Sequence, residues 1–464
     1  MWRYAMKRVL LILPTVGLIL LFAFVLQSYS SKDEVASLVV LDGERGYSSR
    51  ASYMKVYRAY AIKLGYDRPL FYFSIQPDYI PDGIYQILPR FRNTSIRRLL
   101  WETKDADGVM SLANSVNQLQ TEMDIDATDE RLKKILSKIE TTGSLQELKS
   151  VGFELEAFLK NEKSADQALK EVDFLIKELN YSSAWVFPKI VWHGSYNRFH
   201  MWLCNGFNFG GGISLVDGTP ASQKVFRALK WTLAMSIITL ILVAIGSLLL
   251  SLLQVQYQDS LFEKFVTTKL YLIYAMPLFW IATIMVVFFT TSEYGEWTNI
   301  FPSVGIKRSY GEDISFLSEL WNNSSRLILP VLCLSLHSLA YVTKQLKEEM
   351  IATLKKPFII AARARGLNDI QILKNHVLPN SMISYVTLIS GGLASLFTGS
   401  VVIEVIFNIP GLGRLLLDSM NNNDWPVIFL ILILVSISTM LGYLLGDIML
   451  AFLSPKIRSE MEIA

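Results

Sequence analysis

The chain has 464 residues, of which 52% are apolar and only 18% are charged, and its formal net charge is +3. A soluble globular protein usually carries more charge than this. The apolar residues gather in runs long enough to cross a bilayer, which favours a polytopic membrane protein with one sizeable polar insertion. The near-neutral charge gives no support for nucleic-acid binding. Two distant cysteines, Cys204 and Cys333, exclude a disulfide framework and are interpreted as buried free thiols.

The N-terminus is basic over residues 1–8 and leads into an apolar run at 9–26. A secretory signal peptide starts in the same way. However, this run is long for the apolar part of a signal peptide, and the following Gln-Ser-Tyr-Ser-Ser has no clear cleavage pattern of small residues. We therefore predict an uncleaved first transmembrane helix within residues 1–30.

Six apolar runs are each close to the roughly 20 residues that a helix needs to cross the hydrocarbon core. They predict an all-α membrane protein with spans at 9–26, 233–253, 270–291, 327–343, 384–405 and 427–453. The fifth run is rich in Gly and Ser, and such small residues let neighbouring helices approach closely. Its small-residue face is therefore expected inside the bundle.

Charge in the short loops predicts the orientation of these spans. If both termini are cytoplasmic, the inner segments 1–8, 254–269, 344–383 and 454–464 carry 14 Lys and Arg residues, against four in the outer loops 292–326 and 406–426. An excess of Lys and Arg marks cytoplasmic loops. The long segment between the first two spans is left out of this count, because long translocated segments escape the rule.

That long outer segment divides into three parts. Residues 31–90 and 198–230 are aromatic-rich and suit membrane-proximal positions, and 91–197 is a hydrophilic insert with helical signals. Ser144-Leu-Gln-Glu and Ser164-Ala-Asp-Gln both fit a capping box at a helix start. Apolar residues then recur at helical spacing: Leu145, Leu148, Val151 and Leu155, followed by Leu169, Val172, Leu175 and Ile176. We expect three or four short amphipathic helices packed as a small domain.

The inner loop 355–380 has the most informative sequence. Pro357 is typical of a helix start, Gly366 of a helix break, and Asn368 of the N-cap of a second helix. The alanines between them would let a partner approach closely, and Arg363 and Arg365 supply charge. A basic inner loop that only fixes topology remains an equally good interpretation of these residues alone.

The same loop resembles the cytoplasmic coupling loop of ABC importer permeases, in which an Ala-Ala…Gly…Leu-Pro pattern recurs. Ala362-Arg-Ala-Arg-Gly-Leu and then His376-Val-Leu-Pro-Asn resemble the dipeptide/oligopeptide/nickel branch of that family, as does Glu404-Val-Ile-Phe-Asn-Ile-Pro-Gly-Leu-Gly further on. Asp424-Trp-Pro and the segments around residues 64–70, 277–280, 302–305 and 447–458 fit in the same order. The resemblance covers 1–80 and about 198–458, with a transmembrane core at 231–458, and has no counterpart for 91–197.

The resemblance implies the function and the partners of the chain. It implies a permease subunit that forms half of a translocation pathway with a second homologous permease, embedded in the bilayer of a bacterial inner membrane. Two ATP-binding subunits would dock on the coupling loop, and an extracytoplasmic solute-binding protein would deliver the solute. The chain would bind no cofactor itself, since ATP and Mg belong to the partner ATPases, and it has no phosphate-binding loop motif.

The resemblance also assigns candidate residues. The ATPase-coupling set is Ala361, Ala362, Arg363, Ala364, Arg365, Gly366, Leu367, His376, Leu378 and Pro379, and the structural or gating set is Glu404, Pro410, Gly411, Gly413 and Asp447. Position 360 is Ile, where the broader importer motif has an acidic residue. Glu404 and Asp447 lie in or near predicted spans, where ionisable residues face a bundle interior or water, and a structural hydrogen-bonding role is favoured over a gating role for both.

Other functions are weighed against the permease. His193 and His200 lack the neighbours of a metal site, His337 is interpreted as a buried packing residue, and the sequence shows no catalytic constellation. A membrane enzyme is therefore disfavoured. A membrane-anchored sensor or adaptor, which would bind a partner through 91–197, has no need of the coupling-loop pattern. The solute stays open among oligopeptides, dipeptides, nickel chelates and related compounds.

Overall fold

The computed structural model describes residues 2–28, 33–42, 50–86, 90–122, 130–161, 167–182, 187–208, 212–292, 295–307, 315–395 and 401–453. The chain divides into two compact units, each described by itself below. Unit 1 comprises residues 1–29, 210–214 and 219–464, and unit 2 comprises 30–209 and 215–218.

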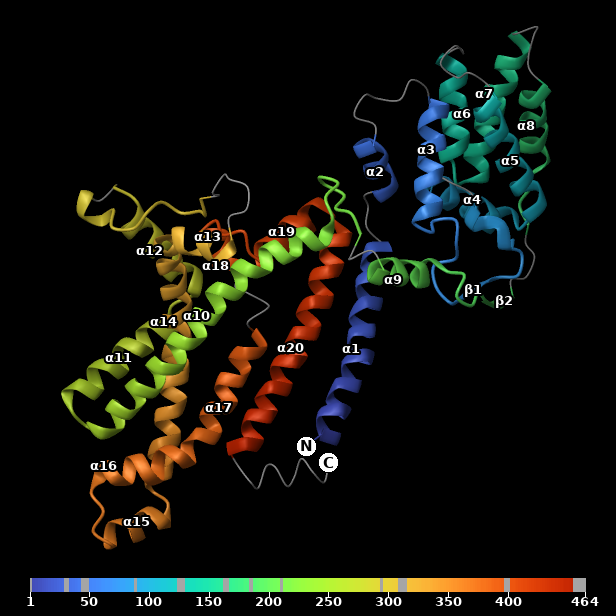
Figure 1. The fold of residues 1–464 in the computed structure, drawn as a ribbon. Coiled ribbons are helices and arrows are strands. Elements are labelled where there is room, and N and C mark those ends of the chain that lie inside the picture. The colour runs from blue at the N-terminus through green and yellow to red at the C-terminus, as the bar shows by residue number, and fades with distance from the viewer. Residues whose placement is uncertain are drawn as a thin grey trace. The chain divides into compact units, whose positions relative to one another are not determined.

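Unit 1 is built from helices (Figure 1). Their bounds are α1 Trp2–Ser28, α10 Ala221–Gln256, α11 Leu261–Ala275, α12 Leu278–Thr290, α13 Phe316–Asn322, α14 Ser324–Leu354, α15 Pro357–Ala364, α16 Asp369–Ile372, α17 Leu378–Ser395, α18 Val401–Ile406, α19 Leu412–Asn422 and α20 Trp425–Leu453. A 3-10 turn, η3, spans Glu296–Thr298, and a π-helix, η4, spans Leu373–Val377. The closest packing joins α10 to α14, α17 to α20, and α1 to α20.

Four of these helices, α1, α10, α14 and α20, are long and apolar enough to cross a membrane, and α11 with α12 makes a fifth span if that bent pair is counted as one. Runs 9–26, 233–253, 327–343 and 427–453 of the predicted spans each lie within one of the four. The fifth predicted span, 384–405, falls on α17 and α18 and includes residues 396–400, which lie outside the described residues.

One of the predicted spans needs correction. The run 270–291 is not one straight helix, because α11 and α12 meet at an angle of 100°. Pro277 causes the break: the residue before a proline is pushed out of the helical region, and Met276 is extended, with φ −82° and ψ 132°. The run 327–343 lies within α14, which continues beyond it to Leu354 as a helix of 31 residues.

Unit 2 carries a helical bundle and a small sheet. Its elements are α2 Glu34–Asp42, α3 Arg50–Lys63, β1 Phe73–Pro77, the 3-10 turn η1 Asp82–Gln86, α4 Arg90–Thr103, α5 Ala106–Glu122, α6 Glu130–Thr141, α7 Leu145–Asn161, α8 Gln167–Glu178, β2 Pro188–Trp192 and α9 Arg198–Asn208. Helices α4 to α8 enclose one apolar core. The described part of the predicted insert therefore holds five helices, where three or four were expected.

The predicted helical faces of the insert are confirmed. Leu145, Leu148, Val151 and Leu155 of α7 are buried, as are Leu169, Val172 and Ile176 of α8, with Leu175 packed against the same core. The helix start predicted after Ser144 is confirmed, but the capping box itself stays a prediction: the first N–H of α7 donates to Glu102 Oε2 at 2.6 Å. Ser164 lies outside the described residues.

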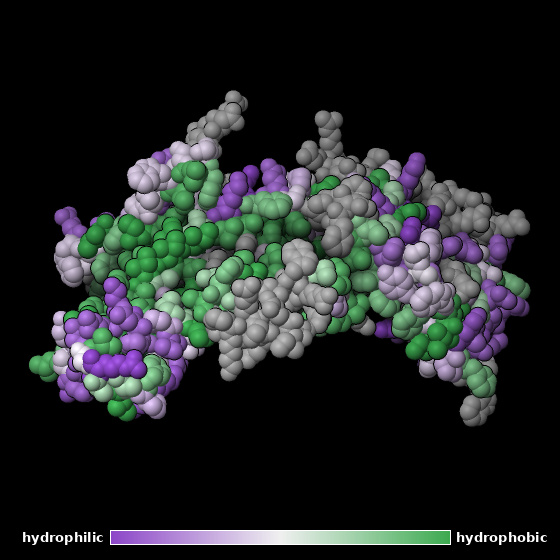
Figure 2. Space-filling view, turned by 60° about the horizontal axis from the view of Figure 1, so that its bottom comes forward, coloured by the Kyte–Doolittle hydropathy of each residue, from purple (hydrophilic) through white to green (hydrophobic). Residues whose placement is uncertain are grey.

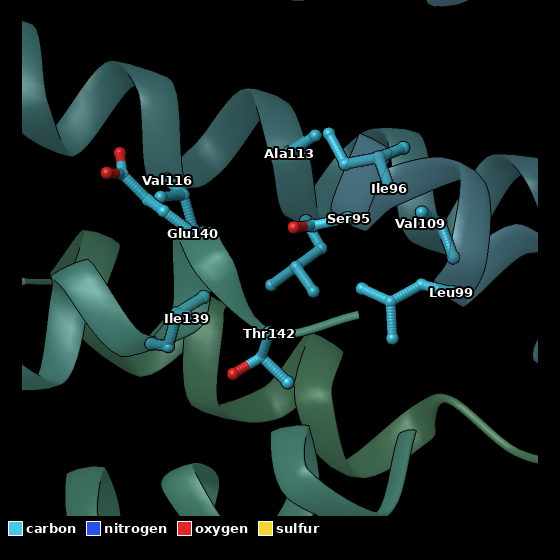
Figure 3. A pocket seen from close by; sticks show the side chains of 10 residues that line it. Ser95, Ile96, Leu99, Val109, Ala113, Val116, Ile139, Glu140 and Thr142 are labelled. Carbon is cyan, nitrogen blue, oxygen red and sulfur yellow. The ribbon is translucent and has the colours of Figure 1, made fainter. Parts of the chain in front are cut away.

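Figure 3 shows a small hollow of this bundle, lined by Ile96, Leu99 and Ile139 beside Ser95 and Thr142. Its volume is about 30 Å³. Small-molecule sites have volumes of roughly 300–1,000 Å³, so this hollow is far too small for such a ligand.

The expectation of an all-α fold is wrong in one place. Strands β1 and β2 pair antiparallel, with Phe73 opposite Trp192 and Pro77 opposite Pro188. The strand pair therefore joins the segment before the insert to the C-terminal part of the insert. The sequence signal was an alternation at 73–77 that is shorter than most strands, and a strand becomes visible only with its partner, which lies more than a hundred residues further along the chain.

The two cysteines also differ from the expectation in part. Cys333 is a buried free thiol, whereas Cys204 is a free thiol that is only half-buried.

Candidate functional site

The segment between α14 and α17 folds as two short helices joined by a glycine turn. Pro357 occupies the first turn of α15, where its missing N–H costs no helical hydrogen bond. Gly366 has φ +85°, a left-handed conformation that other L-residues rarely adopt. Asn368 Oδ1 accepts from the Gln371 N–H at 2.8 Å, and Gln371 Oε1 accepts from the Asn368 N–H at 3.1 Å. The predicted helix start, break and N-cap are therefore confirmed.

One face of α15 anchors this segment and the other is open. Ile359 and Ala362 are buried in a cluster with Ile372 and Val377, which also contains Leu346 and Met350 of α14. The predicted coupling residues on the open side are exposed: Ala361, Arg363, Ala364, Arg365 and Gly366. The segment is thus fixed to the C-terminal end of α14 while it presents small and basic residues outward.

Sequence reasoning missed three large apolar side chains on the same segment. Phe358, Ile360 and Ile370 are 40%, 66% and 62% exposed. Exposed apolar residues that gather beside arginines mark a surface that binds a partner. The available signal was the run of three apolar residues after Pro357, because a short helix cannot bury three consecutive side chains on one face. Figure 2 shows this segment at lower left, where green apolar atoms interrupt the hydrophilic surface.

We call the exposed set the coupling surface; it consists of Phe358, Ile360, Ala361, Arg363, Ala364, Arg365, Gly366 and Ile370. Arg363 forms an ion pair with Asp369 at 3.2 Å. Both side chains are exposed, and such pairs contribute only about 0–1 kcal/mol, so a partner carboxylate can replace Asp369 at little cost.

The remaining predicted coupling residues lie where α17 begins. His376 belongs to the π-helix η4, and its carbonyl accepts from Asn380 Nδ2 at 2.6 Å. Leu367 and Leu378 pack on the same cluster as Ile359, and Pro379 is exposed. π-helical turns occur often at functional sites. The structure thus separates the predicted loop residues into an exposed set on α15 and a set that connects α15 to α17.

A second polar cluster joins α10, α18 and α19. Glu404 is fully buried; its Oε1 accepts from the Thr232 hydroxyl at 2.8 Å, and its Oε2 accepts from the Arg414 N–H at 2.9 Å. The Leu412 N–H donates to Thr232 Oγ1 at 2.8 Å. The first N–H groups of α19, which have no partner within the helix, are therefore satisfied by two side chains from other helices. This geometry supports the structural hydrogen-bonding role that the sequence favoured for Glu404.

The two predicted glycines around this carboxylate leave the space that it needs. A Cβ at Gly411 would lie 2.4 Å from Glu404 Cδ, and a Cβ at Gly413 would lie 2.9 Å from Val401 Cα. Pro410, just before them, is half-buried. These residues and Glu404 form one rigid corner. Asp447 is half-buried on α20, outside this corner, so the structure does not bring it together with Glu404.

A cavity of about 610 Å³ lies between α10, α11, α14 and α17. Its lining comprises Ser236, Thr239, Leu240, Val243, Tyr274, Leu334, His337, Ser338, Tyr341, Val342, Thr387, Leu388, Ile389, Gly391 and Gly392. The sequence did not indicate this site. His337, expected to be a buried packing residue, is half-buried and lines the cavity, with its ring stacked on Tyr274 at 5.9 Å between centroids.

Comparison with known proteins places these features in a family. The family model described as binding-protein-dependent transport system inner membrane component matches residues 247–459. The oligopeptide transport system permease protein AppB of Bacillus subtilis (strain 168) is 28% identical over 263 residues, which cover 56% of this chain and 80% of that protein.

A protein of Brucella suis biovar 1 (strain 1330), named as a peptide transport system permease, is 30% identical over 228 residues, covering 49% of this chain and 68% of that protein. A solved chain of the MetNI methionine ABC transporter, in an inward-facing conformation, aligns at 16% identity and a TM-score of 0.39, over 51% of this chain and 98% of that chain. A TM-score this low does not establish a common fold.

The family match contains the coupling surface, the Glu404 corner and much of the cavity lining. The chain therefore belongs to the family of binding-protein-dependent transport system inner membrane components, as a membrane-spanning permease subunit.

Proposed function

We propose that this permease subunit forms one half of the translocation pathway of an ATP-driven importer for peptides. The observation that carries the proposal is the coupling surface, which mixes exposed alanines, arginines and large apolar residues on an anchored pair of short helices. A basic loop that only fixes topology has no reason to expose Phe358, Ile360 and Ile370. The peptide solute is inferred from relatives that are named as oligopeptide and peptide permeases.

The proposed arrangement has six spans with both termini in the cytoplasm. The excess of Lys and Arg in the inner loops supports it, because the coupling segment then lies on the cytoplasmic side. The insert at 91–197 lies outside, between the first and second spans. A second homologous permease, two ATP-binding subunits and an external solute-binding protein complete the importer, and ATP and Mg are bound by the ATP-binding subunits.

Helix α14 offers the mechanical connection between ATP and solute. Five of its residues between Leu334 and Val342 line the cavity, and two residues separate its end at Leu354 from the start of α15 at Pro357. The buried cluster around Ile359 holds α15 against the inner end of α14. A movement of the coupling surface, driven by closure of the ATPase pair, is therefore passed along a continuous helix to the cavity wall, because a packed helix moves as a rigid element.

Purification of the tagged chain from native membranes in mild detergent tests the proposal. A second permease and ATP-binding subunits should co-purify, and the complex in proteoliposomes should take up peptide when ATP is present. A chain that purifies alone, or with partners held only through the insert, would instead support the sensor or adaptor function.

The variant Arg363→Glu should abolish ATP-driven uptake at normal membrane levels, because it reverses a charge on the coupling surface. The matched control is Arg227→Glu, which reverses an exposed charge near the N-terminal end of α10, away from the coupling surface in sequence. Normal uptake by Arg363→Glu would show that α15 is not part of the interface with the ATP-binding subunits.

A further inference from the structure

The cavity between α10, α11, α14 and α17 has the size of a binding site. Its volume of about 610 Å³ lies within the roughly 300–1,000 Å³ of small-molecule sites. The four helices that bound it all belong to unit 1, and two of them, α14 and α17, directly flank the coupling segment. The chemistry of its wall therefore limits what this subunit can hold during transport.

The wall is polar without being ionic. Hydroxyl groups come from Ser236, Thr239, Ser338, Thr387, Tyr274 and Tyr341. Among the lining residues that the structure describes, none is Asp, Glu, Lys or Arg. An ionised group that leaves water without a partner of opposite charge is strongly disfavoured, whereas an amide can be satisfied by hydroxyl groups. This wall suits uncharged hydrogen-bonding groups.

Aromatic rings cover one side of the wall. The Tyr274 ring lies 5.9 Å from the His337 ring and 6.1 Å from the Tyr341 ring, with interplanar angles of 21° and 20°. His337 and Tyr341 are four residues apart on α14 and therefore share a helix face. Tyr274 and Tyr341 stay 46% and 41% exposed, so part of each aromatic side chain remains accessible for contact with a bound molecule.

Two wall residues hold polar atoms that need a partner. Thr239 Oγ1 and His337 Nδ1 are buried and make no hydrogen bond within the described part of the chain. A buried polar atom without a partner costs about 1–3 kcal/mol, and such atoms are rare in native proteins. Both atoms belong to residues that line the cavity, where a bound molecule can supply the missing partner.

We propose that this cavity binds the uncharged interior of a peptide chain. The inference rests on the proposed importer function and deepens it. Backbone amides hydrogen-bond to the hydroxyl groups and to His337, and they stack on Tyr274 and Tyr341, while the charged ends of the peptide stay outside. Because the wall offers no counter-charge, an anionic metal chelate is rejected. The cavity therefore selects peptides among the solutes that the sequence left open.

Protection of a cysteine by solute tests the proposal in the whole importer with its solute-binding protein. A Cβ at Gly391 meets nothing within 4 Å, so Gly391→Cys places a thiol in the cavity of a chain whose Cys204 and Cys333 are replaced by Ser and Ala. The probes are pentaalanine, the matched peptide Ala-Ala-Asp-Ala-Ala, and nickel–citrate, each at saturating concentration. Labelling by a small methanethiosulfonate reagent is followed with time.

Pentaalanine should slow this labelling at least fivefold, and the other two probes less than twofold. Labelling of Glu348→Cys, an exposed position of α14 outside the cavity, should not change with any probe. Equal protection by pentaalanine and nickel–citrate would overturn the proposal, as would equal protection by the two peptides or no protection by pentaalanine.

Uptake separates this inference from the proposed function. Gly391→Leu fills the cavity, and it should reduce pentaalanine uptake more than tenfold at normal membrane levels. Gly17→Leu adds the same side chain at an exposed and equally open position of α1, and it should transport normally. Normal uptake by Gly391→Leu overturns the cavity site and leaves the importer function intact. Absence of ATP-driven uptake by the unaltered complex would overturn the function itself.

Discussion

The Glu404 corner makes a quantitative prediction about the stability of unit 1. In Glu404→Ala the Arg414 N–H and the Thr232 hydroxyl lose their acceptor in a buried place. Each buried donor left unpaired costs about 1–3 kcal/mol, so the variant should lose about 2–6 kcal/mol of unfolding free energy. The Leu412 N–H keeps its acceptor, Thr232 Oγ1, and adds nothing to this loss.

Glu404→Gln separates hydrogen bonding from charge. Its amide oxygen can keep the Arg414 N–H donor, and its amide group can donate to Thr232 Oγ1. Only the negative charge near the first turn of α19 is lost, which is worth about 0.3–1 kcal/mol. The control Glu348→Ala removes an exposed carboxylate from α14 and should stay within about 0.5 kcal/mol of the unaltered chain.

Cys333 provides the assay. It is fully buried in one apolar cluster with Ile403 and Phe407, the neighbours of Glu404 in sequence and space. In a Cys204→Ser chain, its reaction with a thiol dye during SDS titration in mixed micelles reports unfolding around the corner. The hypothesis that Glu404 caps α19 is wrong if Glu404→Ala unfolds at the same SDS fraction as the unaltered chain. It is also wrong if Glu404→Gln loses as much unfolding free energy as Glu404→Ala.

A steric change at the same corner gives an independent check. A Cβ at Gly411 would come within 2.4 Å of the Glu404 carboxyl carbon, so Gly411→Ala should displace that carboxylate and destabilise unit 1 in the same assay. Gly391→Ala adds a Cβ in open space, and inside a helix that change should be neutral or stabilising by up to about 1 kcal/mol. Equal stability of the two variants would show that the glycine is not needed for the carboxylate to fit.

Three further predictions concern the coupling turn and the insert. Gly366→Ala should reduce uptake and Gly366→Asp should abolish it at normal membrane levels, since φ +85° costs an L-residue about 1–2 kcal/mol and reshapes the coupling surface; normal uptake by both would refute this. Lys160 and Lys177 hold the pKa of Glu156 at about 2, below its ordinary value of 4.5, so this carboxylate stabilises the insert above pH 4.5 and the stabilisation is lost as the pH falls through about 2. The difference in thermal midpoint between the unaltered chain and Glu156→Gln should therefore shrink on acidification, and a pH-independent difference would contradict it. Replacing 78–187 by Asn-Gly, which joins β1 to β2 as a two-residue hairpin, should leave unit 1 inserted in the membrane; loss of the chain from membranes would show that the insert is part of the folding unit.

The sequence by itself determined the features that depend on neighbouring residues or on a periodic pattern. Four of the six predicted spans lie within helices long enough to cross a membrane, because a continuous apolar run requires burial wherever its partners are. Pro357, Gly366 and Asn368 define the coupling segment locally, through a fixed φ, a permitted left-handed φ and a side-chain cap. The helical faces of α7 and α8 follow from apolar spacing alone.

Only the tertiary structure decided the features that depend on distant contacts. Strand β1 forms only because it pairs with β2. Glu404 and Thr232, which are hydrogen-bonded, lie 172 residues apart in the sequence. The cavity is lined by residues of four helices, from residue 236 to residue 392. The exposure of Phe358, Ile360 and Ile370 also could not be predicted, because an apolar run is expected to be buried until the residues packed around it are known. Local preferences act over a few residues, whereas burial and pairing are properties of the assembled chain, and so the elements could be read from the sequence while the site had to be seen in the fold.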